Sequence, residues 1–211
     1  MPLIYEYRST NGGIVGIWAI TETADQLVSG LILTEEDFQK QKTFMLESRR
    51  AEWLAVRKLV WELSNLAPII TYHPSGKPFL PHSNIHISIS HTKGFAAVAM
   101  HPSQVAAIDI EHISDRVLKI SDRFLHPSEA EYIPETEKSI YQTIIWSAKE
   151  TLFKWWGKDA IIFKEQLRIL PFIAKMGKFE INANLLIDNN IETALTLSVR
   201  CNPNYLVVYV V

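Results

Sequence analysis

Apolar residues recur at helical spacing in the segment from Glu47 to Leu66. The recurring positions, three or four residues apart, are Trp53, Val56, Val60 and Leu63. This spacing places them on one face, so the segment is predicted to form an amphipathic helix. Two shorter helices are predicted before it. One covers residues 21–31, and the other begins at Thr34, a capping residue followed by three acidic residues.

Short apolar runs bounded by turn residues predict the strands. One lies before the long helix, at residues 13–20, and four lie after it, at 69–72, 85–90, 95–101 and 105–111. Helical patterns follow at residues 116–125, from Ser128 onward and at 140–156. The tail is rich in strand patterns, at 167–172, 178–186, 193–199 and 205–211.

The order of strand, helices and strands therefore occurs twice, with a crossover near residues 102–104. Two similar α+β lobes would produce this order, and so would a single antiparallel sheet with helices on one side. If there are two lobes, the pattern puts them at residues 1–103 and 104–211.

Composition narrows the class of protein. The 211 residues are 47% hydrophobic and 21% charged, as in an ordinary soluble globular protein. Cys201 is the only cysteine, which excludes an intramolecular disulfide and a cysteine-based zinc site. The formal net charge of −2 argues against a general nucleic-acid binder. There is no signal-peptide pattern and no apolar run of membrane-spanning length, so no membrane association and a cytoplasmic location are expected.

Three segments carry candidate chemistry, and the first is the strand that contains Asp109 and Glu111. Alternation along a strand directs these two carboxylates to the same face, while Ile108 and Ile110 bury the other. Adjacent carboxylates repel each other unless a cation lies between them, and oxygen ligands suit Mg²⁺. The alternative is a strand end that emerges into solvent with two exposed acids.

The second segment is the helix around Glu150. Trp146, Glu150 and Lys154 are four residues apart and share a face, and Lys149 lies beside Phe153 on the adjoining one. A third carboxylate and two lysines would complete a site for a metal and a pyrophosphate. The alternative is an ordinary surface ion pair between Glu150 and Lys154.

The third segment is the strand that ends at Ser90 and His91. A histidine at a strand end can donate to a phosphate, or it can simply satisfy a neighbouring carbonyl. Arg50 and Arg57 lie two turns apart on the long helix, where arginines either bind phosphates or are solvated. The turn Ser75-Gly76-Lys77-Pro78 can direct backbone N–H groups and a lysine towards an anion, although turns of this kind are common.

Each of these features is weak alone, but their order is specific. The chain carries, in sequence, GKPFLP, SISHTKG, VAAIDIE, RFLHPSEAE and WSAKETLFK. This series resembles that of the 4′-phosphopantetheinyl transferase superfamily, in particular its longer single-chain, surfactin-synthetase-activating type. The resemblance extends from about Arg49 to Lys158. One departure is Ala107, where the family usually has a glycine.

The resemblance implies a reaction and its participants. Such enzymes transfer the 4′-phosphopantetheine group of coenzyme A, the co-substrate, to a serine of an apo acyl carrier or peptidyl carrier protein. The reaction depends on Mg²⁺, with Mn²⁺ as the alternative, and it serves fatty-acid, polyketide and nonribosomal peptide biosynthesis. The resemblance also implies a monomer of two pseudo-symmetric α+β lobes, each a small, mostly antiparallel sheet packed with helices, with the active site at their interface.

It further implies roles for individual residues. The metal ligands would be Asp109, Glu111 and Glu150. The catalytic residues would be Glu150, Lys149 and Glu129. Coenzyme A contacts would come from Arg50, Arg57, Gly76, Lys77, Pro78, Ser90, His91, Lys149 and Lys154, which assigns coenzyme A to residues 1–103 and the metal to 104–211.

Two other functions use the same residues. Another Mg²⁺-dependent enzyme that cleaves pyrophosphates would need the three acids but no carrier protein. A non-catalytic module that binds coenzyme A or a carrier protein would be expected to lose acidic ligands, and all three are present.

Overall fold

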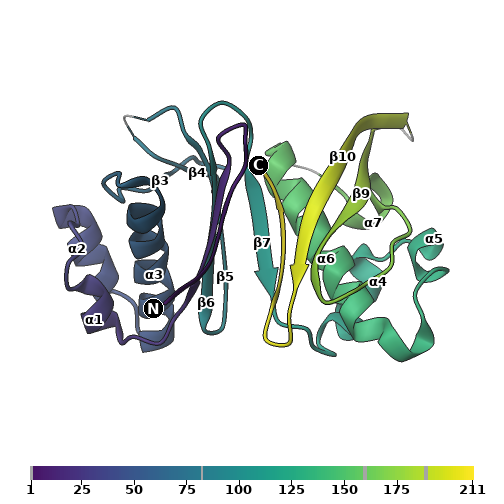
Figure 1. Ribbon diagram of the computed structural model, residues 1–211, viewed down its shortest axis with the longest axis horizontal. Helices are drawn as coiled ribbons and strands as arrows, with labels where there is room; N and C mark the ends of the chain where they lie inside the picture. Colours follow the sequence, from purple (N-terminus) through teal and green to yellow (C-terminus); the bar gives the residue numbers. More distant parts are fainter. Residues whose placement is uncertain (1, 82, 159–160, 188–189) are drawn as a thin grey trace. The chain divides into compact units, whose positions relative to one another are not determined.

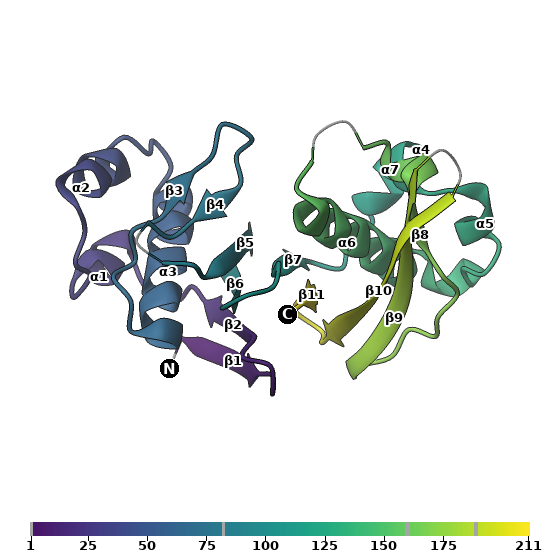
Figure 2. The ribbon, with the colours of Figure 1, turned by 90° about the horizontal axis from the view of Figure 1, so that it is seen from above.

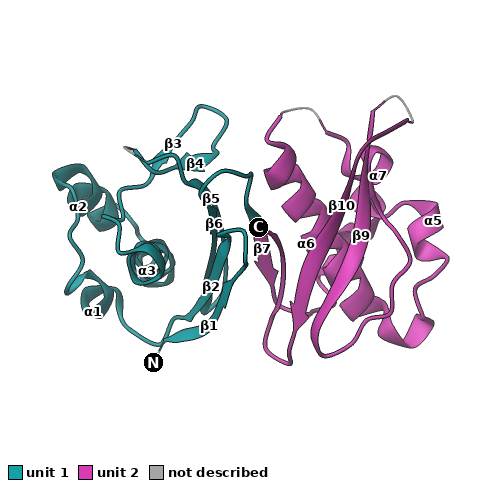
Figure 3. Cartoon of the chain, turned by 45° about the horizontal axis from the view of Figure 1, so that its top comes forward, with its two compact units in different colours: residues 1–107, 211 teal, residues 108–210 magenta. Residues whose placement is uncertain are grey.

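The computed structural model describes residues 2–81, 83–158, 161–187 and 190–211. The chain divides into two compact units, residues 1–107 together with Val211, and residues 108–210 (Figure 3). Whether these units correspond to the two functional lobes expected from the sequence stays a prediction.

The first unit is a four-stranded sheet with helices on one face (Figure 1). The strand order is β1-β2-β6-β5, and each neighbouring pair is antiparallel. The strands are β1 (Leu3–Arg8), β2 (Ile14–Ala19), β5 (His86–Thr92) and β6 (Phe95–His101). The helices are α1 (Ala24–Val28), α2 (Glu35–Lys42) and α3 (Glu47–Ser64). A small hairpin, β3 (Thr71–Tyr72) and β4 (Pro78–Phe79), follows α3.

Helix α3 supplies most of the core of this unit. Its buried residues Leu54, Leu59 and Leu63 pack with Val98 and other sheet residues. The approach is close at Gly16, where an added Cβ would lie 2.7 Å from the Leu63 side chain. The absence of a side chain at this position therefore allows α3 to lie directly on β2.

The second unit is a five-stranded sheet packed against one long helix, α6 (Lys138–Trp156) (Figure 2). The strand order is β7-β11-β10-β9-β8. The strands are β7 (Ala107–Glu111), β8 (Leu167–Ile169), β9 (Gly177–Ile187), β10 (Asn190–Cys201) and β11 (Leu206–Val210). The shorter helices are the 3-10 turns Val117–Ile120 and Glu135–Glu137, α4 (Ser121–Phe124), α5 (Pro127–Ala130) and α7 (Phe163–Gln166).

The core of the second unit lies between α6 and its sheet. Ile144, Ala148 and Leu152 of α6 are fully buried with Val199 of β10 and Val208 of β11. This face of α6 anchors the helix, and Trp146, Phe153 and Trp156 of the same helix pack against the edge of the core.

The α+β prediction is confirmed, and several local predictions are corrected. Strand β1 was not predicted, because its tyrosines are only half-buried and its charged residues are exposed. The segment 116–125 is a 3-10 turn and a four-residue helix, and not one continuous helix. Helix α5 begins at Pro127 with His126 as its cap, so Ser128 lies inside it. Within the described residues, the structure has no helix with the length and apolar character needed to cross a bilayer.

Candidate functional site

Strand β7 and helix α6 bring four of the predicted residues together. The Nζ of Lys154 lies 2.8 Å from Oδ1 of Asp109 and also donates to the backbone oxygen of Ile108, at 3.0 Å. About two helical turns before Lys154, Trp146 Nε1 donates to Oε1 of Glu111 over 3.1 Å. Residues four apart on α6 therefore face β7, as their spacing predicts.

The carboxylates of this group are close enough to perturb one another. Burial first, and then the charges of Asp109 and Glu111, raise the pKa of Glu150 to about 7, against an opposing effect of Lys154. Burial and the charge of Asp109 also raise the pKa of Glu111. These shifts indicate a crowded cluster of negative charge, since each neighbouring carboxylate disfavours ionisation of the next.

The alternatives considered for these residues do not hold. Asp109 is only 4% exposed, so it is not a solvated acid at a strand end. Lys154 forms an ion pair with Asp109 of β7, and not the simple surface pair with Glu150 along the helix. Ala107, which stands where the family usually has glycine, is fully buried.

The chemistry of the three carboxylates suits a hard divalent cation, but their present arrangement does not form a finished site. Mg²⁺ prefers oxygen donors, and a bound cation would relieve the repulsion between neighbouring carboxylates. Across the residues that the structure describes, however, no three His, Cys, Asp or Glu side chains are grouped so that they could hold an ion. Glu111 accepts a hydrogen bond from Trp146, and Asp109 accepts one from Lys154. The fit is therefore one of donor type and charge.

Lys149 and Glu129 form a separate, fully buried pair. The Lys149 Nζ lies 2.7 Å from Glu129 Oε2, and both side chains are 0% exposed. The ammonium also donates to the backbone oxygens of Phe124 and Phe163. Glu129 accepts two further bonds, from the backbone N–H groups of His126 and Ile169. All three protons of the ammonium are thus used inside the fold, and neither side chain has surface to offer a substrate in this arrangement.

The two predicted arginines lie on α3 in the first unit and bond to neighbouring helices. Arg57 is 1% exposed, and its guanidinium forms two bonds to the carboxylate of Asp37 on α2, at 2.9 and 3.2 Å. It also lies 3.2 Å from the centre of the Trp53 ring. Arg50 donates to Gln41 of α2 and pairs with Asp25 of α1. A phosphate could therefore contact the Arg57 guanidinium only if Asp37 released it.

The remaining predicted residues lie on β5 and in the β3–β4 hairpin. Ser90 is 8% exposed, whereas the His91 side chain is 40% exposed and its Nδ1 lies 3.3 Å from Oε2 of Glu52. Gly76 has a φ of 82°, the left-handed conformation that this turn requires. Lys77 and Pro78 follow it and are half-buried.

The sequence analysis missed the residues that contact these predicted ones, namely Asp37, Gln41 and Glu52. Glu52 carried a usable signal. It lies four positions before Val56, so it continues the apolar face of the helix, where a charged residue is out of place.

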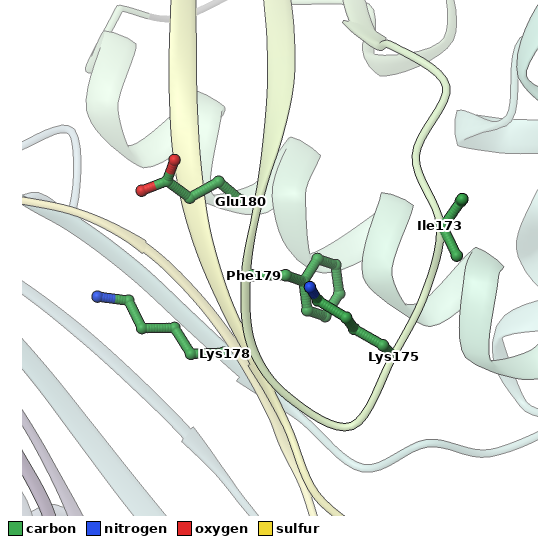
Figure 4. A pocket seen from close by; sticks show the side chains of 5 residues that line it. All are labelled: Ile173, Lys175, Lys178, Phe179 and Glu180. Carbon is green, nitrogen blue, oxygen red and sulfur yellow. The ribbon is translucent and has the colours of Figure 1, made fainter.

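One open pocket, of about 580 Å³, lies in the second unit (Figure 4). It is lined by Ile173, Lys175, Lys178, Phe179 and Glu180. None of these five residues belongs to the predicted site, so the pocket adds nothing to the carboxylate cluster.

Comparison with known proteins supports the resemblance. Residues 106–182 match the family model of the 4′-phosphopantetheinyl transferase superfamily. A curated relative, the 4′-phosphopantetheinyl transferase gsp of Aneurinibacillus migulanus, is 32% identical over 119 residues, which is 52% of this chain. The chain spans about half the length of that relative, 48% of it.

The segment matched by the family model contains the whole β7–α6 cluster and the buried Lys149–Glu129 pair. The resemblance to the 4′-phosphopantetheinyl transferase superfamily that the motif series indicates is thereby supported by the family model over residues 106–182 and by this relative.

Proposed function

We propose that this protein transfers the 4′-phosphopantetheine group of coenzyme A to a serine of an apo acyl carrier or peptidyl carrier protein and releases 3′,5′-ADP. The observation that carries the proposal is the convergence of Asp109, Glu111, Glu150 and Lys154 on β7 and α6. The match of the surrounding residues to the superfamily supports it.

The chemistry requires one bond to form and one to break. The serine oxygen attacks the phosphorus attached to the pantetheine arm, and the P–O bond to the other phosphate breaks, so 3′,5′-ADP leaves. Mg²⁺, with Mn²⁺ as the alternative, would be held by Asp109, Glu111 and Glu150, and when bound it would neutralise negative charge on the pyrophosphate. Lys154, next to Asp109, would add positive charge to the same region.

The serine must lose its proton during this attack, and we assign the proton to Glu150. A carboxylate accepts a proton more readily when its pKa is raised, and burial and the charges of Asp109 and Glu111 raise the pKa of Glu150 in the absence of a metal. Glu150 is also partly exposed, so an incoming hydroxyl can reach it.

The other predicted residues take roles that depend on their surroundings. His91, Ser90, Arg50 and the Gly76-Lys77-Pro78 turn are proposed as coenzyme A contacts from the first unit. For Lys149 and Glu129 we propose an indirect catalytic role, because their pair ties α5 to α6 and fixes the helix that carries Glu150. Arg57 can contact coenzyme A only if Asp37 releases it.

The cellular setting is proposed from the same sequence features. We expect a cytoplasmic monomer that acts in fatty-acid, polyketide or nonribosomal peptide biosynthesis, without nucleic-acid or membrane partners.

The test follows coenzyme A and 3′,5′-ADP by chromatography, with Mg²⁺ and with or without a panel of apo carrier proteins. The proposal predicts that 3′,5′-ADP forms only when a carrier is present and that Glu150→Ala abolishes it. Glu192→Gln, which changes an exposed carboxylate on β10, is the matched control and should remain active. Release of 3′,5′-ADP without a carrier would indicate a pyrophosphate-cleaving enzyme instead. Binding of coenzyme A without turnover on any carrier would indicate a binding module.

A further inference from the structure

Glu52 is a buried acid that the proposed chemistry leaves without a role. It lies on α3 between buried apolar residues, and its side chain is 9% exposed. Burying a carboxylate costs free energy unless charged or hydrogen-bonding partners compensate it. A glutamate at such a position therefore needs a specific reason.

The partners of Glu52 supply one. Its Oε2 lies 2.9 Å from NH1 of Arg49 and 3.3 Å from Nδ1 of His91. Arg49 is largely exposed and is on the same helix, so it comes from the solvent side. His91 comes from β5, at the end next to the turn into β6, and opposite it on β6 stands the uncharged Ala96. Glu52 thus links α3 to a histidine on a separate element.

We propose that Glu52 is a positioning residue that orients His91 for its contact with the phosphates of coenzyme A. This inference rests on the proposed function, because it takes His91 as a phosphate contact.

The physical basis lies in the two nitrogens of the imidazole ring. A carboxylate against Nδ1 holds the proton on that nitrogen and fixes the ring, so Nε2 is directed to the side away from Glu52. When Nε2 carries a proton as well, it donates a hydrogen bond on that side. A phosphate oxygen is an acceptor, so this is the form of the ring that it binds.

Glu52 cannot contact coenzyme A through the same oxygen, because a carboxylate repels a phosphate. Its effect must pass through His91, which makes a double-mutant cycle the decisive test. Coenzyme A binding is measured by calorimetry for the wild type, Glu52→Ala, His91→Ala and the double variant. Each single change should weaken binding about tenfold, the loss of one charge-assisted contact, and the double variant should be no weaker than His91→Ala alone.

Two further measurements separate positioning from general structure. Long-range ¹H–¹⁵N spectra of the histidine rings should show Nδ1 protonated at His91 in the wild type and a mixture of tautomers in Glu52→Ala. Glu52→Gln keeps an acceptor without the charge and should bind coenzyme A with intermediate affinity. Glu62→Gln removes a partly exposed carboxylate from the same helix, where it pairs with Lys58, and should bind like the wild type.

The outcomes are distinct. If His91→Ala weakens binding and Glu52→Ala does not, or if their effects add, the inference is wrong while the proposed function stands. An unchanged His91 spectrum in Glu52→Ala would also overturn it. If the wild type does not bind coenzyme A, the proposed function fails, and the inference fails with it.

Discussion

Replacing Glu129 by glutamine distinguishes a structural role from a catalytic one. The carboxylate accepts bonds from Lys149 and from the backbone N–H groups of His126 and Ile169, at 2.7, 2.8 and 2.8 Å. Glutamine has one acceptor oxygen in place of two and leaves the Lys149 ammonium buried without a countercharge. Breaking a buried ion pair in this way costs about 3–5 kcal/mol.

That cost is a large part of the free energy of unfolding of a domain, which is about 5–15 kcal/mol. With a urea m-value of about 1.5 kcal/mol/M, the midpoint of unfolding should fall by about 2–3 M. Tryptophan fluorescence can follow the transition, since Trp146, Trp155 and Trp156 lie in α6. Glu131→Gln, an exposed glutamate next to α5, is the control and should change stability by less than about 0.5 kcal/mol.

The effect on activity completes the test. Where Glu129→Gln is still folded, its activity per folded molecule should fall only moderately, because Glu129 touches no reacting atom. A variant with the wild-type midpoint and no transfer activity would refute this reasoning, and Glu129 would then act in the chemistry itself. The double variant with Lys149→Met should be less destabilised than the sum of the two single variants, since both remove the same pair.

Three further predictions concern individual contacts. The pKa of Glu150 is raised to about 7, so the folded protein holds the proton of this carboxyl group more tightly than the unfolded chain does. The resulting stabilisation of the fold is present below about pH 4.5 and is lost as the pH rises through 7. In thermal melts Glu150→Gln should lack this loss and be more stable than the wild type at pH 8, and an identical pH profile would contradict it. Trp146→Phe removes the hydrogen bond to Glu111 and should raise the Mg²⁺ concentration needed for half-maximal activity several-fold. The free energy of unfolding, measured in urea, should fall by about 1 kcal/mol. An unchanged Mg²⁺ requirement would argue against Glu111 as a ligand. Asp37→Asn leaves Arg57 poorly paired and should lower stability by about 3–5 kcal/mol without changing coenzyme A affinity; tighter binding in calorimetry would instead mean that Asp37 competes with a phosphate for Arg57.

The elements with a strong period were predictable from the sequence. The helix over 47–66 is observed at Glu47–Ser64, and the predicted strand over 95–101 is observed at Phe95–His101. Strand β1 was missed because one of its faces is half-buried and the other exposed, and the apolar Ile4 lies on the exposed face, so the sequence shows no apolar alternation. Weak segments such as 116–125 break up because packing, and not local propensity, decides their form.

The candidate site was predictable only in part, for a similar reason. Spacing alone placed Trp146, Glu150 and Lys154 on one face of α6, and that face meets Asp109 and Glu111. Spacing could not reveal that Lys149 would be neutralised by Glu129, or Arg57 by Asp37, each twenty residues away in the chain. A pattern identifies which residues can bind phosphate, whereas the tertiary partners decide which of them are available.

The most direct test of the proposed function is the intact mass of an apo carrier protein after incubation with this protein, coenzyme A and Mg²⁺. The account predicts that the carrier gains one phosphopantetheine group on a serine, and that the gain disappears with EDTA and with Asp109→Ala. A carrier of unchanged mass across a panel of apo carriers, with the wild-type protein folded and coenzyme A present, would contradict it.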